Sequence, residues 1–501
     1  MIKIVSIENM RKSDAFTIES GVSSRELMLR AGKGIYDSVE WWGDIAIICG
    51  KGNNGGDGYA LATLLKESSF EPHVFMVEEP ATPDAIYYYE ECKKAGVKIT
   101  LLERGTPLRK YNVIVDCIFG TGFKGAVLDP YKTAIEKINN TRAYVVSADI
   151  NSGLNGDSGL CDIAVYSNLT VAIGEYKSGH YLAQAKDYIG ELKRCDIGIE
   201  IQDKPYYLIE KSDTSSLLFK RMHYSHKGTY GYMALIGGST EYSGAIKLAN
   251  LSASAVSCGA GVVKLAVAET LARAVAPYLL ESTLYTLEDY GSGHIRFNSG
   301  ELELLCRHTR AIGVGMGIGH TDDTEKIVEY LLKNYKGKLL IDADGLNALS
   351  FMDLSLLKKA KCKVVLTPHL KEMERLCKKP AWEVEQNPVK VAKEFAKEYG
   401  VVLLLKGPTT IITDGEEVYF SDTGSSAMAK GGSGDVLSGI ITAFLATTEK
   451  RSAIQSTYLG AYVNGLAGEL AEISHSQITA TPRDTVKYVP LAIEELLRSN
   501  L

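Results

Sequence analysis

The sequence lacks the features of disulfide-stapled, membrane-embedded and nucleic-acid-binding proteins. Its nine cysteines are scattered and never spaced Cys-x-x-Cys, which argues against a disulfide framework and a zinc site. No apolar run approaches the ~20 residues that cross a bilayer, and no signal peptide opens the chain. Lysine and arginine total 55 against 61 acidic residues, a net charge of −6, so no basic field for nucleic acid is present. We expect a cytoplasmic protein with a small-molecule partner, no membrane and no nucleic acid.

Size and composition predict more than one soluble domain. The chain has 501 residues, of which 45% are hydrophobic and 23% charged. This balance allows a large buried core, and a chain of this length usually divides into domains.

The first 200 residues alternate short β-branched runs with helical stretches. We expect buried strands at 44–49, 73–77, 111–117 and 144–150, with helices at 59–68 and 83–95 between them. Thr82 would cap the second helix, and Pro83 would occupy its first turn, where proline fits. The alternation predicts a Rossmann-like, doubly wound parallel sheet.

A polar segment at 201–230 interrupts this pattern, and the alternation then begins again. The expected elements are strands at 232–236, 262–267, 311–314, 338–342, 363–367 and 401–406, a hairpin of 410–413 with 417–420, and a helix at 435–446. We therefore predict two tandem α/β domains, 1–205 and 221–501.

Two glycine-dense segments each precede a predicted helix. Residues 50–58 read Gly-Lys-Gly-Asn-Asn-Gly-Gly-Asp-Gly, and residues 430–435 read Lys-Gly-Gly-Ser-Gly-Asp. Glycine lets a backbone approach a phosphate and present its N–H groups, and a following helix adds its positive end. Two such segments predict two ligand sites.

The first segment satisfies Gly-x-Gly-x-x-Gly, so an ordinary dinucleotide fold and a purely structural turn are alternatives. Neither requires the polar side chains of Asn53, Asn54 and Asp57. Two other strands end in carboxylates, Asp116 and Asp149, and each would alternatively cap a turn.

Ligands of doubly wound sheets bind at the carboxyl ends of strands, so these groups are expected to converge. Asn54, Asp116 and the Ser152 hydroxyl form an oxygen set suited to a hard cation, which leaves Asp149 for proton transfer.

Three motifs carry a family resemblance. Gly-Asn-Asn-Gly-Gly-Asp-Gly at 52–58, Asp-x-x-x-Gly-Thr-Gly at 116–122 and Ala-Asp-Ile-x-Ser-Gly at 148–153 resemble the NAD(P)H-hydrate epimerase family over about the first 200 residues. The resemblance implies K⁺ at Asn54, Asp116 and Ser152. It also implies that the hydrated dinucleotide is held by Asn53, Asn54, Gly55, Gly56, Asp57, Gly120, Thr121, Gly122, Phe123, Lys124, Gly125, Ala126 and Asp149. Two positions depart from the family pattern: Asn151 replaces a proline, and Leu29 replaces an acidic residue.

The second segment predicts kinase-like chemistry. Successive glycine N–H groups at a helix start form an anion hole, and the adjacent Asp435 would take a proton from a hydroxyl that meets phosphorus. A glycine-rich cap on a packed helix is the alternative. Lys406 at a strand end suits a nucleotide phosphate, although a lone lysine there is often a solvated charge. His369 is a binding candidate and, alternatively, a hydrogen-bonded structural histidine.

The second half carries its own resemblance. The motifs are His226-Lys227-Gly228, Gly237-Gly238, 315–319, 342–347, Thr367-Pro368-His369 with Glu372, Lys406-Gly407 and 431–435. Together they resemble the ADP-dependent NAD(P)H-hydrate dehydratase family, which has a ribokinase-like fold, from about residue 221 onward. Ser425-Ser426-Ala427 stands where that family usually has Asn-Pro-Gly/Ala.

This resemblance implies that Gly317, His369 and Asp435 face the hydrated nicotinamide, and that Mg²⁺ accompanies ADP. It implies ADP binding by Lys406, Gly407, Pro408, Thr409, Thr410, Ser425, Ser426, Ala427, Met428, Ala429, Lys430, Gly431, Gly432, Ser433 and Gly434.

Both halves indicate one pathway, the repair of NADHX and NADPHX, the hydrated forms of NADH and NADPH. We predict R/S epimerisation at C6 with Asp149 as acid/base, and ADP-dependent dehydration of the S epimer with Asp435 as base. A homo-oligomer is also expected. A vitamin or sugar kinase would share 431–435 but would use ATP, and a non-catalytic binding domain would not need Asp116 and Asp149.

Overall fold

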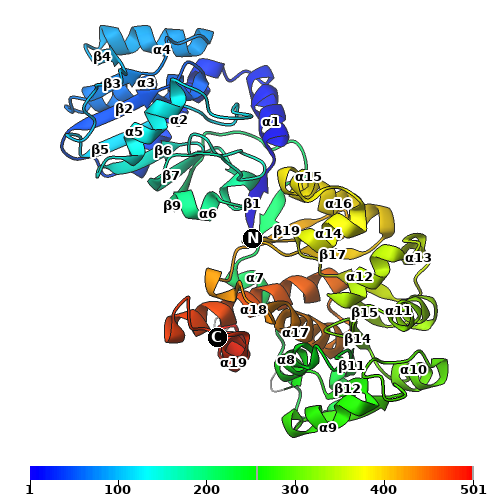
Figure 1. Ribbon diagram of the computed structural model, residues 1–501. Coiled ribbons are helices and arrows are strands. Elements are labelled where there is room, and N and C mark those ends of the chain that lie inside the picture. Colours follow the sequence, from blue (N-terminus) through cyan, green and yellow to red (C-terminus); the bar gives the residue numbers. More distant parts are fainter. Residues whose placement is uncertain (255–257, 499–501) are drawn as a thin grey trace. The chain divides into compact units, whose positions relative to one another are not determined.

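The computed structural model describes residues 1–254 and 258–498 and divides into two compact units (Figure 1). The N-terminal unit spans Lys3–Tyr206, and the C-terminal unit runs from Tyr207 onward together with Met1 and Ile2. Among the helices of these residues, none combines the length and apolarity that a membrane span needs. The predicted mixed α/β architecture is confirmed.

The N-terminal unit contains a fully parallel sheet in the order β4-β3-β2-β5-β6-β7-β9. Two further strands of this part of the chain, β1 and β8, pair in parallel, and Val5 lies opposite Lys177 in that pair. The strands are β1 (Ile2–Val5), β2 (Ile45–Cys49), β3 (His73–Met76), β4 (Lys98–Leu101), β5 (Val113–Cys117), β6 (Tyr144–Ala148), β7 (Ser167–Ile173), β8 (Tyr176–Lys177) and β9 (Ile189–Cys195).

The first two helices of this unit, α1 and α2, begin at serine side chains that cap them. Ser6 accepts a hydrogen bond from the Asn9 N–H, and Ser23 accepts one from the Glu26 N–H. The helices are α1 (Ile7–Glu19), α2 (Ser24–Ser38), α3 (Asn53–Glu67), α4 (Pro83–Lys94), α5 (Tyr131–Asn139), η1 (Ser178–His180) and α6 (Ala185–Tyr188). Central strands β2 and β5 are buried throughout, which explains their continuous apolar sequence.

The C-terminal unit contains a longer sheet with strands in the order β13-β12-β11-β14-β15-β16-β17-β18-β19-β10. The pairs are parallel from β13 to β17, and β17, β18 and β19 pair antiparallel. The strands are β10 (Tyr206–Leu208), β11 (Tyr232–Ile236), β12 (Val262–Ala268), β13 (Ser282–Leu287), β14 (Ala311–Val314), β15 (Lys338–Ile341), β16 (Lys363–Leu366), β17 (Val402–Leu405), β18 (Thr410–Thr413) and β19 (Val418–Ser421).

Helix α17 is buried continuously from Val436 to Thr447 and packs against α8 and α18. The α-helices are α7 (Lys211–Ser215), α8 (Ser243–Ser254), α9 (Ala272–Val275), α10 (Ser299–Cys306), α11 (Asp322–Asn334), α12 (Asp344–Phe351), α13 (Ser355–Lys358), α14 (Leu370–Cys377), α15 (Ala381–Gln386), α16 (Pro388–Tyr399), α17 (Ser433–Thr447), α18 (Ala453–His475) and α19 (Pro482–Arg498). Single 3₁₀ turns are η2 (Lys227–Tyr230), η3 (Glu269–Leu271), η4 (Ala276–Tyr278) and η5 (Ser426–Met428).

Several predicted boundaries were wrong, chiefly the starts of the two helices at the glycine segments. The first glycine segment is not a loop that precedes a helix at Tyr59, because α3 already begins at Asn53. Likewise α17 begins at Ser433 rather than Asp435. The polar segment 201–230 contains β10 and α7, and Thr82 makes no side-chain cap although Pro83 does occupy the first turn.

Candidate active sites

The first candidate site lies at the point where the strand order of the N-terminal sheet reverses. Strand β2 is followed in sequence by β3 and β4 on one side, whereas β5 and β6 lie on its other side. Ligands of such sheets bind outside the carboxyl ends of the strands at this switch point. The glycine segment follows β2, Asp116 is in β5, and Asp149 follows β6.

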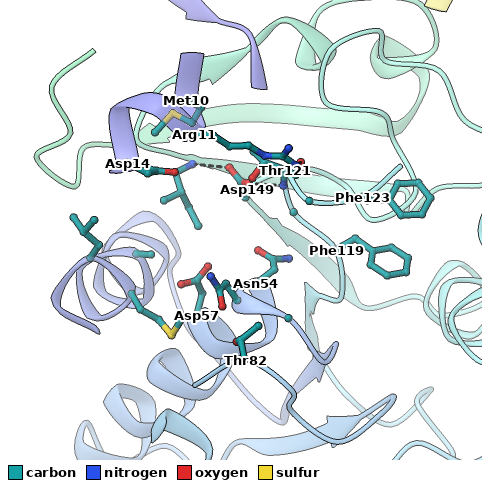
Figure 2. Close-up of a pocket in the computed structure, with 18 of the residues that line it drawn as sticks. Met10, Arg11, Asp14, Asn54, Asp57, Thr82, Phe119, Thr121, Phe123 and Asp149 are labelled. Carbon is teal, nitrogen blue, oxygen red and sulfur yellow. Dashed lines mark hydrogen bonds between the residues drawn. The ribbon is translucent and has the colours of Figure 1, made fainter. Parts of the chain in front are cut away.

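A cavity of about 710 Å³ occupies this position (Figure 2). The predicted residues among its lining are Asn53, Asn54, Asp57, Gly120, Thr121, Gly122, Phe123, Lys124 and Asp149. Figure 2 shows Asn54 and Asp57 on one side and Asp149 with Asp14 on the other, while the Phe119 and Phe123 rings stack 4.6 Å apart between centroids. This cavity is large enough for part of a dinucleotide.

Four of the predicted binding residues do not line the cavity: Gly55, Gly56, Gly125 and Ala126. Two of them pack tightly instead, because a Cβ on Gly55 would lie 2.0 Å from the Gly50 carbonyl oxygen and one on Gly56 would lie 2.5 Å from the Met28 sulfur. Leu29, the first departure from the family pattern, is exposed and also outside the lining.

Asp149 is held firmly in place. Its Oδ1 accepts from Lys177 Nζ at 2.5 Å, and its Oδ2 accepts from the Thr121 N–H at 3.2 Å. Its φ of +64° is left-handed, a conformation that aspartate tolerates better than most residues. His180 Nε2 donates to the Asp149 carbonyl at 2.7 Å, and burial lowers the pKa of His180 to about 4, so this imidazole is neutral.

The three predicted cation ligands meet around one short segment, residues 118–120. Asp116 is wholly buried, and its carboxylate accepts from the Ile118 N–H and the Ser152 N–H and hydroxyl at 2.5–3.2 Å. The Phe119 N–H donates to Ser152 Oγ at 2.8 Å. A Cβ on Gly120 would lie 3.0 Å from Asp149 Oδ2 and 3.2 Å from Asn54 Oδ1, so a larger residue here would crowd both side chains.

The charge and hydrogen-bonding balance of this region leaves room for a cation. No ion pair involving Asp116 occurs among the described residues, and burial raises its pKa. Both polar atoms of the Asn54 amide are buried without a hydrogen-bond partner. A buried carboxylate without a counter-charge and an unpaired amide oxygen suit K⁺.

Asn151, the second departure from the family pattern, has a structural role. Its fully buried amide donates to the Val165 carbonyl at 2.8 Å and the Tyr188 carbonyl at 3.1 Å, and its Oδ1 accepts from Thr170 Oγ1 at 2.5 Å. These bonds hold the turn that carries Asp149 and Ser152, so side-chain contacts replace the stiffness of a proline.

The sequence analysis did not identify several residues of the cavity, and two of them, Lys177 and Asp14, carry charges that bear on the chemistry. Lys177 is 1% exposed in the short strand β8, and Asp14 lies on α1. A signal for Asp14 was present, because Met10, Asp14 and Ile18 recur at the i, i+4, i+8 spacing of one helix face, and all three line the cavity. No local pattern marks Lys177.

The second candidate site lies at the carboxyl ends of β15, β16 and β17, which are followed by Asp342, Thr367 and Lys406. Lys406 Nζ pairs with Asp342 Oδ1 at 2.9 Å and Glu372 Oε2 at 3.7 Å. Ser438 donates its hydroxyl to Asp342 Oδ2 at 2.6 Å. Burial alone would lower the pKa of Lys406, but the carboxylates of Asp342 and Glu372 outweigh it and the pKa is raised.

Asp435 stands beside this cluster on the first turn of α17. The N-cap, Gly432, has a φ of +101°, which favours glycine, and it provides no side-chain cap for the first N–H groups. A Cβ on Gly434 would lie 3.4 Å from Lys406 Nζ. Burial and the negative charge of Asp342 raise the pKa of Asp435 to about 7, against the opposing effect of Lys406.

The other predicted ADP-binding residues lie in neighbouring turns. Gly407, Pro408 and Thr409 join β17 to β18, which starts at Thr410, and Ser425 caps the single turn η5 through a bond from the Ala427 N–H. Ser426, Met428 and Ala429 continue that turn toward Gly431. Lys430 instead points its amino group at the carbonyl oxygens of Ile478 and Ala480, so its charge fastens the loop before α19.

His369 and Gly317 have identifiable structural roles. His369 caps α14: its Nδ1 accepts from the Lys371 N–H at 3.0 Å, and its own N–H donates to Glu372 Oε2 at 2.8 Å. The histidine side chain remains 52% exposed. Gly317 has a φ of +64° and lies against Tyr242, whose carbonyl oxygen would be 2.6 Å from a Cβ. Near them, the Thr367 hydroxyl is buried without a hydrogen-bond partner.

Fold and sites together define a tandem α/β enzyme with a buried acid–lysine cluster in each unit. Comparisons with known proteins agree. A family model described as NAD(P)H-hydrate dehydratase matches residues 233–491, and one described as YjeF-related protein N-terminus matches residues 24–179.

Two curated relatives match nearly the whole chain. A bifunctional NAD(P)H-hydrate repair enzyme of Archaeoglobus fulgidus is 34% identical over 498 residues, which are 98% of this chain and 99% of the relative. One of Moorella thermoacetica is 33% identical over 95% of this chain and 93% of its own. A ribokinase-like superfamily protein from Enterococcus faecalis shares the fold, with a TM-score of 0.50 and 23% identity over 58% of this chain and 96% of that one.

The chain belongs to the family of bifunctional NAD(P)H-hydrate repair enzymes. The predictions of family, of a ribokinase-like second half and of a repair enzyme with epimerase and dehydratase activities are confirmed.

Proposed function

We propose that the N-terminal unit epimerises hydrated NAD(P)H at C6 and that the C-terminal unit dehydrates the S epimer with ADP. The carrying observation is Asp435, a carboxylate with a pKa of about 7 at the uncapped start of α17. Such a group accepts a proton near neutral pH while the helix start accommodates phosphate charge.

In the N-terminal unit, the cavity at the switch point would hold the hydrated nicotinamide against Asp149. Asn53, Asn54 and Asp57 on the first turns of α3, and the segment 120–124, form the surrounding wall. The stacked rings of Phe119 and Phe123 offer an aromatic surface at its edge. Asp149 is our candidate acid/base for the C6 hydroxyl.

K⁺ would be held by Asn54, Asp116 and Ser152. The support is the unpaired Asn54 amide and the buried Asp116 carboxylate without an ion-pair partner among the described residues. When bound, the cation would supply positive charge beneath the cavity. Loss of K⁺ dependence in an Asn54→Ala variant would support this ligand set.

In the C-terminal unit, phosphorylation would convert a poor leaving group into a good one. Asp435 takes the proton of the C6 hydroxyl as its oxygen attacks the β-phosphorus of ADP, and AMP leaves. The N–H groups of 432–434 stabilise the charge on the transferred phosphoryl group. The ring nitrogen then expels phosphate, and loss of a proton from C5 restores NAD(P)H.

ADP would bind along 406–410 and 425–434, with Lys406 beside the phosphates. In the described part of the chain no three His, Cys, Asp or Glu side chains are arranged to hold a metal by themselves. Mg²⁺ would therefore bind chiefly through the phosphates of the nucleotide, as it commonly does. The substrates proposed are NADHX and NADPHX, for a cytoplasmic enzyme that forms a homo-oligomer.

The decisive experiment is incubation of the chain with chemically hydrated NADH, with and without ADP. We expect ADP-dependent recovery of the reduced-nicotinamide absorbance, with AMP and phosphate formed in equal amounts. Recovery without ADP, or none with it, would contradict the proposal. Phosphorylation of a stable alcohol by ATP would instead indicate a small-molecule kinase.

A further inference from the structure

Four carboxylates and four cationic groups line the N-terminal cavity: Asp14, Asp57, Asp84, Asp149, Arg11, Lys51, Lys124 and Lys177. Asp14, Asp57, Asp149 and Lys177 act on one another electrostatically. They come from α1, α3, the end of β6 and β8. Lys177 pairs with Asp149, whereas burial and the Asp149 charge favour the protonated forms of Asp14 and Asp57. The question is which acid exchanges protons with the substrate.

Asp149 is the acid with the most fixed contacts. Besides Lys177 and the Thr121 N–H, it accepts from the Ile173 N–H at 3.4 Å. The Lys177 ammonium also donates to the Ile173 carbonyl at 2.6 Å, so the lysine itself is immobile. A carboxylate held by a buried ammonium has a fixed orientation, so it can position the substrate and accept a proton from one direction.

Asp14 is the acid with no such restraint. Within residues 1–254 and 258–498, no hydrogen bond or ion pair of its side chain occurs, although it lines the cavity beside Met10 and Arg11. In Figure 2 its carboxylate lies next to Asp149 and across from Asp57. Asp14 is therefore close to the reacting region and can change its protonation without breaking a contact.

We propose that Asp14 is a second catalytic residue of the epimerisation, the proton donor to the departing C6 hydroxyl. This rests on the proposed function of the N-terminal unit. The nitrogen lone pair forms the C6=N1 bond as the C6–O bond breaks, and the oxygen takes the Asp14 proton and leaves as water. Water then adds to the opposite face of C6, the π electrons return to N1, and Asp149 takes the released proton. Proton exchange with water in the cavity then reprotonates Asp14 and deprotonates Asp149.

The charges around Asp14 suit this role. Burial, opposed by Lys177 and assisted by the charge of Asp149, raises the pKa of Asp14 to about 6. Asp57 faces the same group, with a pKa that burial and Asp149 raise well above the ordinary range. Arg11, which donates to the Thr121 carbonyl at 3.1 Å, is the other charged residue of α1 at this wall.

The test uses the full chain and a mixture of both epimers of hydrated NADH with excess ADP. Dehydration of the S epimer gives a fast phase, and a slow phase follows whose rate is set by epimerisation. For Asp14→Asn we expect an unchanged fast phase and a slow phase reduced roughly 10²- to 10⁴-fold in kcat, with little change in KM. Asp14→Glu should recover part of the rate.

A matched control is Glu19→Gln, which removes one negative charge from the exposed end of the same helix. It should behave as wild type. The wild-type slow phase should also fall as pH rises past about 6, and this limb should disappear in Asp14→Asn.

Two outcomes would overturn the inference. The first is a slow phase of wild-type rate and pH profile in Asp14→Asn. The second is a rise in KM with kcat unchanged, which would mean that Asp14 only positions the substrate. If wild type itself showed no enzymatic slow phase, the proposed function of the unit would fail instead.

Discussion

The two units differ in which carboxylate pairs with the buried lysine. Each places one buried lysine among several carboxylates at the ends of parallel strands. In the N-terminal unit Lys177 pairs directly with Asp149, the predicted acid/base, at 2.5 Å. In the C-terminal unit Lys406 pairs with Asp342 and Glu372, and Asp435 has no ion-pair partner among the described residues. The lysine therefore determines which carboxylate is held and which is free to exchange a proton.

This difference predicts different chemical tasks for the two aspartates. A carboxylate fixed by an ion pair keeps its position, whereas burial and neighbouring negative charges raise the pKa of an unpaired carboxylate toward neutral pH. Asp435 is of the second kind, with a pKa of about 7. Asp14 is its counterpart in the N-terminal unit, since it too is crowded and has no fixed partner.

The largest expected effect comes from Asp435→Asn. Removal of the base should reduce ADP-dependent dehydration by roughly 10²-fold or more, because asparagine accepts no proton from the C6 hydroxyl. Epimerisation, followed by chromatographic separation of the two epimers, should continue at the wild-type rate. Asp322→Asn, an exposed position on α11, is the matched control. Full dehydratase activity in the variant would remove Asp435 from the mechanism.

Removal of either buried lysine should strongly destabilise its own unit. Lys406→Met leaves Asp342 and Glu372 without a counter-charge, and Lys177→Met does the same to Asp149. We expect each to lower the free energy of unfolding by about 3–5 kcal/mol in urea titrations. Lys333→Met, which breaks only an exposed pair with Glu329, should cost less than about 1 kcal/mol. Equal effects of all three would refute the comparison.

The smallest effect is a shift in pH dependence. Asp435 must be ionised to act as a base, so kcat/KM for dehydration should rise with pH through about 7. The carboxylate of Asp344 contributes to the raised pKa. Asp344→Asn should therefore move the midpoint of the kcat/KM profile to lower pH. A midpoint that stays in place or moves upward would show that another group limits the rate.

The sequence was most informative where local pattern and long-range structure agree. Short apolar runs identified β11 and β14 to the residue, and a turn at Asp414-Gly415 identified the β18–β19 hairpin. The glycine segments misled at helix starts, because glycine is a poor helix former in isolation. Here packing overrides that preference: a Cβ on Gly58 would lie 2.7 Å from the Cys49 sulfur, so only glycine allows α3 to lie this close to the sheet.

In the candidate sites too, the sequence identified the residues that local motifs mark and missed those that only the tertiary fold brings in. Asp116, Asp149 and Asp435 were recognisable because motifs surround them. Lys177 was not, since it reaches Asp149 through the pairing of β8 with β1, which joins residues far apart in the sequence. Asp14 was missed because its signal, the i, i+4, i+8 spacing of Met10, Asp14 and Ile18, is equally typical of an ordinary packed helix face.

The most direct test of two separate sites is complementation between two variants. Asp149→Asn should dehydrate the S epimer of hydrated NADH and stop, and Asp435→Asn should epimerise without dehydration. The account predicts that a mixture of the two variants, with ADP, converts both epimers completely to NADH. Conversion that halts at the S fraction, with each variant retaining its one activity, would contradict it.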